Sequence, residues 1–65
     1  MRMSYYIDLI ERRLLRITNK TKRSEIQKEY DEAFDIESDA LLIRKLRVIA
    51  EKTNKVIDSQ EMDWS

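Results

Sequence analysis

The sequence contains no cysteine, histidine, glycine or proline among its 65 residues. Without cysteine and histidine, the chain has no disulfides, no thiolate nucleophile and none of the usual ligands of zinc or haem. Without glycine, it lacks the phosphate-binding loops of the Walker and Rossmann types, and tight hairpin turns are disfavoured. These absences argue against a β-rich fold and against most classes of enzyme.

Charge and hydropathy exclude two further classes of protein. The chain carries 13 basic and 13 acidic residues, so its net charge is zero, which argues against a general nucleic-acid binder or a polybasic membrane anchor. No apolar run approaches the roughly 18 residues of a membrane-spanning helix, and the first residues lack the pattern of a secretory signal. We expect a cytoplasmic protein with no cofactor and no metal.

The abundance of leucine, isoleucine, glutamate, lysine and arginine favours helices. The sequence predicts one all-α domain over residues 1–65, either a small antiparallel helical hairpin or a three-helix bundle. The helices are expected near 4–18, 24–35 and 38–58, with a frayed tail at 59–65. A chain this short buries only about 60% of its unfolded surface, so we expect homodimerisation to complete the core.

Local signals predict where these helices begin and end. Ser4 is a candidate N-cap of the first helix, and Ser24 opens an S-x-x-Q capping box for the second. Asn19 is a candidate for the left-handed conformation at a helix end. A break is expected within 35–38, although a single helix over 24–58 remains an alternative because neither glycine nor proline interrupts it.

The stretch from Ser38 to Asp58 is the element around which the chain is organised. Its apolar positions form a broad stripe at helical spacing, suited to two neighbouring helices. The stripe comprises Leu42, Ile43, Leu46, Ile49, Ala50, Thr53, Val56 and Ile57. Leu41 and Val48 lie outside it, one heptad apart. These two residues have no obvious partner within the chain.

The first two helices have simpler patterns. The first has a 4-3-4-3 seam, made of Met3, Ile7, Ile10, Leu14 and Ile17. Tyr5 and Leu9 lie on another flank of that helix. In the second helix, Tyr30 and Phe34 are interpreted as core residues. The apolar side chains that the core needs least are our candidates for partner binding. They are Tyr5, Leu9, Leu41, Val48 and Trp64.

Charge is arranged in bands along the chain. Residues 11–23 hold six basic groups and one acid, residues 25–39 hold seven acids and one lysine, and residues 44–55 hold five basic groups and one acid. Antiparallel neighbours would bring opposite bands together, which sets register more than stability. The candidate electrostatic contacts with a partner are Arg12, Arg16, Asp31, Glu32 and Asp35.

Three other interpretations of the charged residues are weighed. The basic patch of residues 12–23 is a candidate nucleic-acid site in a dimer, with Tyr5 nearby for stacking. The acidic band of residues 25–39 is a candidate mimic of nucleic acid. Asp31, Asp35 and Asp39 would share one face of a continuous helix and offer oxygen ligands to a metal. A solvated surface explains both bands more simply.

The tail S-Q-E-M-D, residues 59–63, resembles the S-Q-E-L-D signature of the small two-helix phosphatases that act on aspartyl-phosphate response regulators in spore-formers. The resemblance covers five residues and implies a site at Ser59, Gln60, Glu61 and Asp63. In that family more apolar helix follows the motif, whereas here Trp64 and Ser65 follow it. That departure puts the supporting helix in doubt.

The sequence as a whole favours a function without catalysis. There is surplus apolar surface, no recognisable set of catalytic groups, and balanced but banded charge. We expect a small regulator or inhibitor that docks a helical face on a larger partner protein. The alternatives are a nucleic-acid-binding dimer that uses residues 12–23 and, less favoured, a phosphatase with the S-Q-E-M-D tail.

Overall fold

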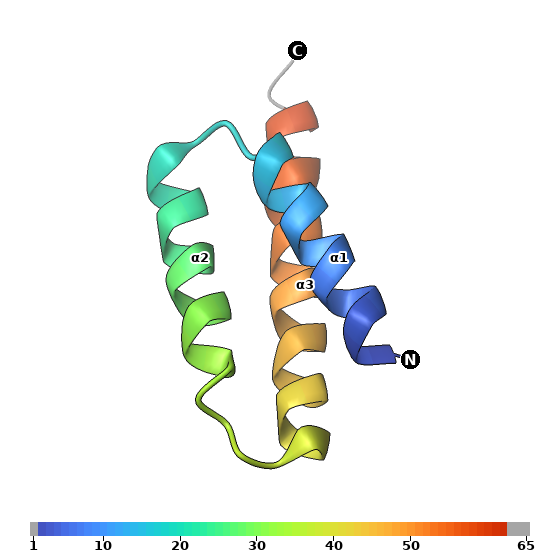
Figure 1. The fold of residues 1–65 in the computed structure, drawn as a ribbon. Helices are drawn as coiled ribbons and strands as arrows, with labels where there is room; N and C mark the ends of the chain where they lie inside the picture. Colours follow the sequence, from blue (N-terminus) through green and yellow to red (C-terminus); the bar gives the residue numbers. More distant parts are fainter. Residues whose placement is uncertain (1, 63–65) are drawn as a thin grey trace.

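The computed structural model describes residues 2–62 and, within them, the side chains of residues 3–60. Three α-helices follow one another, α1 (Arg2–Arg16), α2 (Lys20–Ala33) and α3 (Asp39–Met62). Helices α1 and α3 run in the same direction and α2 runs opposite to both (Figure 1). No strand occurs in the described range. The predicted all-α fold is confirmed in its three-helix form, and the alternative of one helix over 24–58 is wrong.

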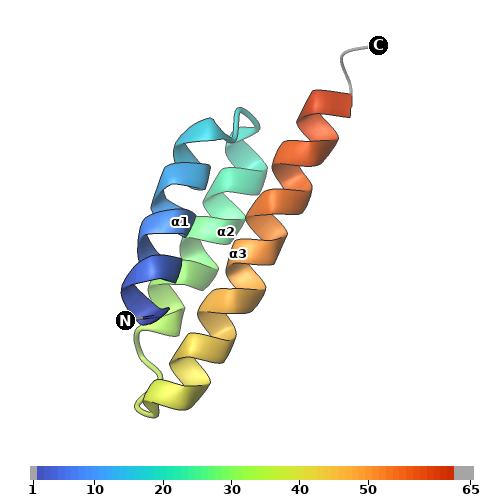
Figure 2. The same cartoon turned by 90° about the vertical axis from the view of Figure 1, so that its right-hand side faces the viewer.

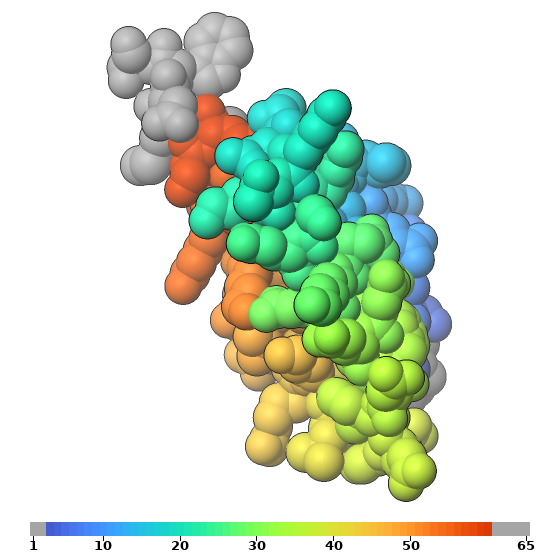
Figure 3. All heavy atoms as spheres, turned by 90° about the vertical axis from the view of Figure 1, so that its left-hand side faces the viewer, coloured from blue at the N-terminus to red at the C-terminus, as the bar shows by residue number. Residues whose placement is uncertain are grey.

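Helix α3 is the central element of the fold. It packs against both shorter helices, whereas α1 and α2 contact each other much less. Figure 2 shows the long α3 lying alongside both of them. Seen from the side of α2, side chains close the space between α2 and α3, and a strip of α3 remains uncovered along one edge (Figure 3). The central role predicted for residues 38–58 is therefore confirmed.

The core is formed by the apolar stripes that the sequence predicts. Helix α3 contributes the largest share, and Thr53, the one buried polar side chain among residues 3–60, donates from Oγ1 to the carbonyl oxygen of Ala50 at 2.7 Å. That bond removes the cost of burying an unpaired hydroxyl. The buried apolar residues are Ile10, Leu14, Ile17, Ile26, Tyr30, Ala33, Leu42, Leu46, Ile49, Ala50 and Ile57.

The start of α2 differs from the prediction. Asn19, expected in a left-handed conformation, has φ −74° and ψ 112° and is the N-cap. Its Oδ1 accepts from the backbone N–H of Lys22 at 3.0 Å, which satisfies one of the free amide groups of the first turn. Ser24 lies inside the helix, so the predicted capping box is wrong. The preceding connection is accordingly shorter than expected and spans 17–19.

The other helix ends also differ in detail. Helix α1 begins at Arg2, so Ser4 lies inside it and is not its N-cap. The predicted break between the second and third helices is confirmed, with non-helical backbone over 34–38. Ser38 precedes α3, and its carbonyl oxygen accepts from Leu42 N at 2.9 Å. Helix α3 continues to Met62, so the predicted fraying of the tail is wrong for residues 59–62, which are helical. Residues 63–65 lie outside the described range.

Phe34 is the apolar residue whose predicted burial is wrong. Helix α2 ends at Ala33, one residue before Phe34, and the side chain of Phe34 is 46% exposed. Its ring meets that of Tyr30 edge to face, with 5.1 Å between centroids. Tyr30 itself is buried, as predicted. Phe34 therefore covers one edge of the core without entering it.

Candidate partner-binding surface

Leu41 and Val48 are exposed on one ridge of α3, 53% and 42% respectively. They are one heptad apart, so they lie about 10.5 Å from each other along the helix axis. Both project away from the buried stripe of α3, as the sequence predicts. Their part in binding a partner stays a prediction.

Ile36 extends this apolar surface from the α2–α3 connection. It lies with Leu41 and Val48 around a shallow hollow of about 380 Å³, whose lining is almost entirely apolar. Ile36 is half-buried and packs against the core. The sequence does not mark Ile36 as a site residue, because a residue in a predicted break has no helical face to assign. We call these three residues the apolar ridge.

Two cations, Arg44 and Lys45, also line the hollow of the apolar ridge. Neither forms a hydrogen bond or an ion pair with any side chain in the described range, 3–60. In contrast, Arg47 contacts Glu51 at 3.7 Å and Lys52 contacts Glu29 at 2.7 Å. The surface of the hollow is therefore apolar, and two cationic residues without a counter-charge among the described side chains contribute to its lining.

Tyr5 and Leu9 line a second hollow, between α1 and α3. Tyr5 is exposed and its ring meets Tyr6 edge to face at 5.4 Å, whereas Leu9 is half-buried against the core. A third hollow, which includes Ile43 and Arg44, separates this pair from the apolar ridge. The two predicted apolar flanks are thus distinct surfaces on neighbouring parts of the molecule.

Two further apolar residues bear on the partner-binding prediction. Leu15 is 84% exposed on α1, in agreement with its position outside the predicted seam. Leu15 lines none of the hollows described above, so it serves as a control position. Trp64, the remaining candidate, lies outside the described residues.

The predicted electrostatic residues are not brought together into one site. Arg12 Nε pairs with Asp8 on its own helix at 3.2 Å, and Asp31 Oδ1 accepts from Gln27 Nε2 at 3.1 Å. The carbonyl oxygen of Arg16 accepts from Gln60 Nε2. The acids Glu32 and Asp35 are exposed, the first on α2 and the second in the following turn.

Two polar contacts between helices involve residues outside the predicted set of electrostatic contacts with a partner. Arg13 is half-buried, and its Nη1 donates to the carbonyl oxygen of Ala50 at 2.9 Å, which joins α1 to α3. Lys52 Nζ contacts both carboxylate oxygens of Glu29, at 2.7 and 2.9 Å, which joins α3 to α2. Because the second pair is partly exposed, it is worth about 0.2–1 kcal/mol. The Lys52–Glu29 pair is a contact of the predicted kind, between the basic band of residues 44–55 and the acidic band of residues 25–39.

Tyr30 makes the polar contact between α2 and α1. Its hydroxyl donates to Glu11 Oε2 at 2.8 Å. Burial, followed by this hydrogen bond and the negative charge of Glu11, raises the pKa of Tyr30 well above its ordinary value of 10.0. The phenol therefore stays protonated over the whole physiological range and acts as a hydrogen-bond donor.

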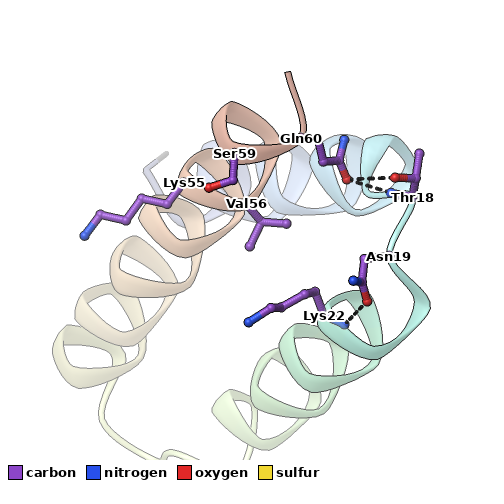
Figure 4. Close-up of a pocket in the computed structure, with 7 residues that line it drawn as sticks. All are labelled: Thr18, Asn19, Lys22, Lys55, Val56, Ser59 and Gln60. Carbon is purple, nitrogen blue, oxygen red and sulfur yellow. Dashed lines mark hydrogen bonds between the residues drawn. The ribbon is translucent and has the colours of Figure 1, made fainter. Parts of the chain in front are cut away.

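The hollow next to the S-Q-E-M-D tail is drawn in Figure 4. Gln60 Oε1 accepts from the backbone N–H of Thr18 at 2.7 Å and from its hydroxyl at 3.2 Å. Its Nε2 donates to Arg16 O at 3.1 Å. Both ends of the amide are thus engaged in joining α3 to the end of α1. In Figure 4 the side chains of Lys22 and Lys55 extend away from Gln60.

The break between α2 and α3 also separates the candidate metal ligands. Asp31 lies on α2, Asp35 in the turn and Asp39 at the start of α3, so the three do not share one helical face as a continuous helix would require. Within the described part of the chain, no cluster of three or more acidic, histidine or cysteine residues is suited to hold a metal ion.

Over the described residues, no helix combines the length and the apolar character required to cross a membrane.

Comparison with models of protein families, with curated proteins and with solved structures finds no match for this chain.

Proposed function

We propose that this protein is a small, non-enzymatic interaction module, a regulator or inhibitor that docks a helical face on a larger partner protein. The observation that carries the proposal is the exposure of Leu41 and Val48 on one ridge of α3. Together with Ile36 they line an apolar hollow. A domain this small needs most of its apolar side chains for its core, so apolar residues left exposed call for an explanation. Contiguous exposed apolar surface of this kind marks interaction sites.

Docking would use the apolar ridge for affinity and the charged residues around it for orientation and association rate. Tyr5 and Leu9 offer a second contact surface, because a tyrosine supplies a large amphipathic area at low entropic cost. The chain carries no histidine or cysteine, and the amide of Gln60, one of the four site residues that the S-Q-E-M-D resemblance implies, is engaged in joining helices. These points favour binding over catalysis.

The experiment is a comparative capture from the source cell. The full chain, the double variant Leu41→Glu/Val48→Glu and the control Leu15→Glu are immobilised, and bound proteins are quantified by mass spectrometry. We expect partners that the wild type and the Leu15 variant retain and the double variant loses. All three proteins must show the same helical circular dichroism. Identical sets of bound proteins for all three would overturn the proposal.

A second copy of the chain is the competing occupant of the exposed apolar flanks, and the small size of the domain favours it. Nucleic-acid binding through residues 12–23 is the alternative from another class. It is supported less well, because Arg13 is engaged with Ala50 and Arg12 with Asp8. Affinity for duplex or single-stranded nucleic acid with a steep salt dependence, lost in Arg12→Ala/Arg16→Ala, would support that alternative.

A further inference from the structure

We propose that the apolar ridge receives an acidic amphipathic helix of another protein. This inference rests on the interaction function proposed above and specifies the chemistry of the partner. Within the apolar ridge, Leu41 and Val48 lie at heptad spacing. Two cations that line the same hollow, Arg44 and Lys45, lack a counter-charge among the described side chains. A helix laid along α3 with apolar residues seven apart would seat them on Leu41 and Val48.

The charge of the ridge determines which helix fits. Arg44 and Lys45 lie one turn beyond Leu41 and one turn before Val48, so a docked helix would face them between its two apolar anchors. Carboxylates at those positions would gain charge-assisted hydrogen bonds as water is excluded. A neutral or basic helix would instead leave two cations partly desolvated without partners, which costs binding free energy.

The ridge of a second copy of this chain does not supply carboxylates opposite Arg44 and Lys45. In a two-fold interface each copy presents the same patch. Arg44 and Lys45 stand at the midpoint between Leu41 and Val48 in the sequence, so pairing the two ridges in either direction brings cations against cations. Such juxtaposition of like charge is destabilising.

The acidic helix of this chain does not supply the occupant either. Helix α2 carries most of the acidic band, but every exposed side chain between Lys20 and Ala33 is polar. It therefore lacks the apolar anchors that would seat on Leu41 and Val48. Neither the ridge nor α2 of a second copy therefore supplies both the acidic and the apolar side chains, and the proposed occupant is a helix of another protein.

The test uses two designed helical peptides that share one apolar heptad seam of leucines. One peptide carries glutamate and the other lysine at the positions flanking the seam, and each is labelled and titrated with the full chain by fluorescence anisotropy. We expect the glutamate peptide to bind at least about tenfold more tightly than the lysine peptide. The preference should weaken with added salt because the cations are exposed.

Variants locate the site and give matched controls. Arg44→Glu/Lys45→Glu should invert the preference, and Leu41→Ala/Val48→Ala should weaken binding of the glutamate peptide at least about tenfold. Lys28→Glu/Lys55→Glu changes the charge equally at two exposed positions outside the apolar ridge and should leave the preference in place. NMR shifts on addition of the glutamate peptide should centre on Ile36, Leu41 and Val48.

Three outcomes would overturn the inference. The first is equal affinity for both peptides, or no binding up to about 1 mM. The second is a dimer in sedimentation that the substitutions at Leu41 and Val48 dissociate, which makes a second copy the occupant. The third is duplex DNA that displaces the glutamate peptide. If the capture experiment succeeds while the peptides fail, the interaction function stands and only the partner chemistry is wrong.

Discussion

Gln60 near the end of α3 and Thr18 after α1 are joined by two hydrogen bonds, although 42 residues separate them in sequence. Gln60 Nε2 also donates to the carbonyl oxygen of Arg16, in the last turn of α1, where the helix itself supplies no donor. One amide side chain therefore fixes the end of α1 against the last turns of α3, in the part of the chain where the sequence predicts a frayed tail.

Replacement of Gln60 should destabilise the fold. We expect Gln60→Ala to lower the free energy of unfolding by about 1–2 kcal/mol, because it removes the partner of both a backbone amide and a backbone carbonyl. Urea denaturation followed by circular dichroism measures the change. Gln27→Ala is the control, since Gln27 bonds only to Asp31 on its own exposed helix face. Equal losses for the two variants would mean that the contact with Thr18 contributes nothing of its own.

Arg13 and Arg12 should differ strongly despite their adjacency. Arg13→Ala removes a partly buried donor to Ala50 O and should cost about 1–2 kcal/mol. Arg12→Ala removes an exposed pair with Asp8 on the same helix and should cost no more than about 0.5 kcal/mol. The measurement is the free energy of unfolding in denaturant. Similar costs for both would contradict a structural role for Arg13.

The position of the α2 N-cap can be tested with two substitutions. Asn19→Ala should destabilise the protein by about 1 kcal/mol, because the amide of Lys22 loses its acceptor. Ser24→Ala, inside the helix, should be neutral or slightly stabilising because alanine has the higher helix propensity. Thermal denaturation of both variants decides between the two caps. The reverse ranking would restore the capping box that the sequence suggests.

The protein should lose stability in alkali through Tyr30. The unfolded chain releases this proton near the ordinary pKa of 10.0 and the folded protein only at higher pH. Above about pH 10 the unfolded state therefore binds fewer protons, and stability falls as pH rises. The stabilising effect of Tyr30 relative to Tyr30→Phe should be constant below about pH 9 and shrink from about pH 10 upward.

The measurement for Tyr30 is the free energy of unfolding as a function of pH for wild type and variant. Tyr5→Phe serves as the control: it removes an exposed phenol but leaves the bond between Tyr30 and Glu11, so the alkaline loss should persist. A difference between wild type and Tyr30→Phe that stays constant to about pH 12 would show that Tyr30 ionises alike in both states.

The oligomeric state distinguishes the two occupants considered for the apolar ridge. The repulsion expected between Arg44 and Lys45 of paired ridges predicts that the protein sediments as a monomer. Arg44→Glu, which would place opposite charges across a two-fold axis, should then promote dimers. Sedimentation equilibrium of wild type and variant measures this. A wild-type dimer that Leu41→Glu/Val48→Glu converts to monomers would support the homodimer that sequence length favours.

Much of the fold follows from patterns that the sequence displays openly. The apolar stripes that contain Ile10 and Leu46 are buried as expected, because the helical spacing of the apolar residues shows which face of each helix packs into the core. Leu41 and Val48 were predicted to lie outside the stripe, and their exposure follows from the same periodicity. For these residues local sequence and tertiary structure agree.

Other features depend on contacts that no local pattern encodes. Asn19 and Ser24 are both residue types that cap helices well, and the structure uses Asn19. Gln60 is ordered by Thr18, far away in sequence. Arg13 resembles its basic neighbours until α3 places a carbonyl oxygen beside it. Phe34 is left outside the core because α2 ends at Ala33, a boundary that an uninterrupted run of helix formers does not mark.

The central position of α3 has a consequence for how the protein acquires its structure during synthesis. Helices α1 and α2 leave the ribosome before α3, yet they contact each other much less than either contacts α3. Their apolar faces stay uncovered until the segment through Ile57 has emerged from the exit tunnel. Folding of this unit is therefore completed only after α3 has been synthesised, and a nascent chain arrested before α3 would expose apolar surface to chaperones.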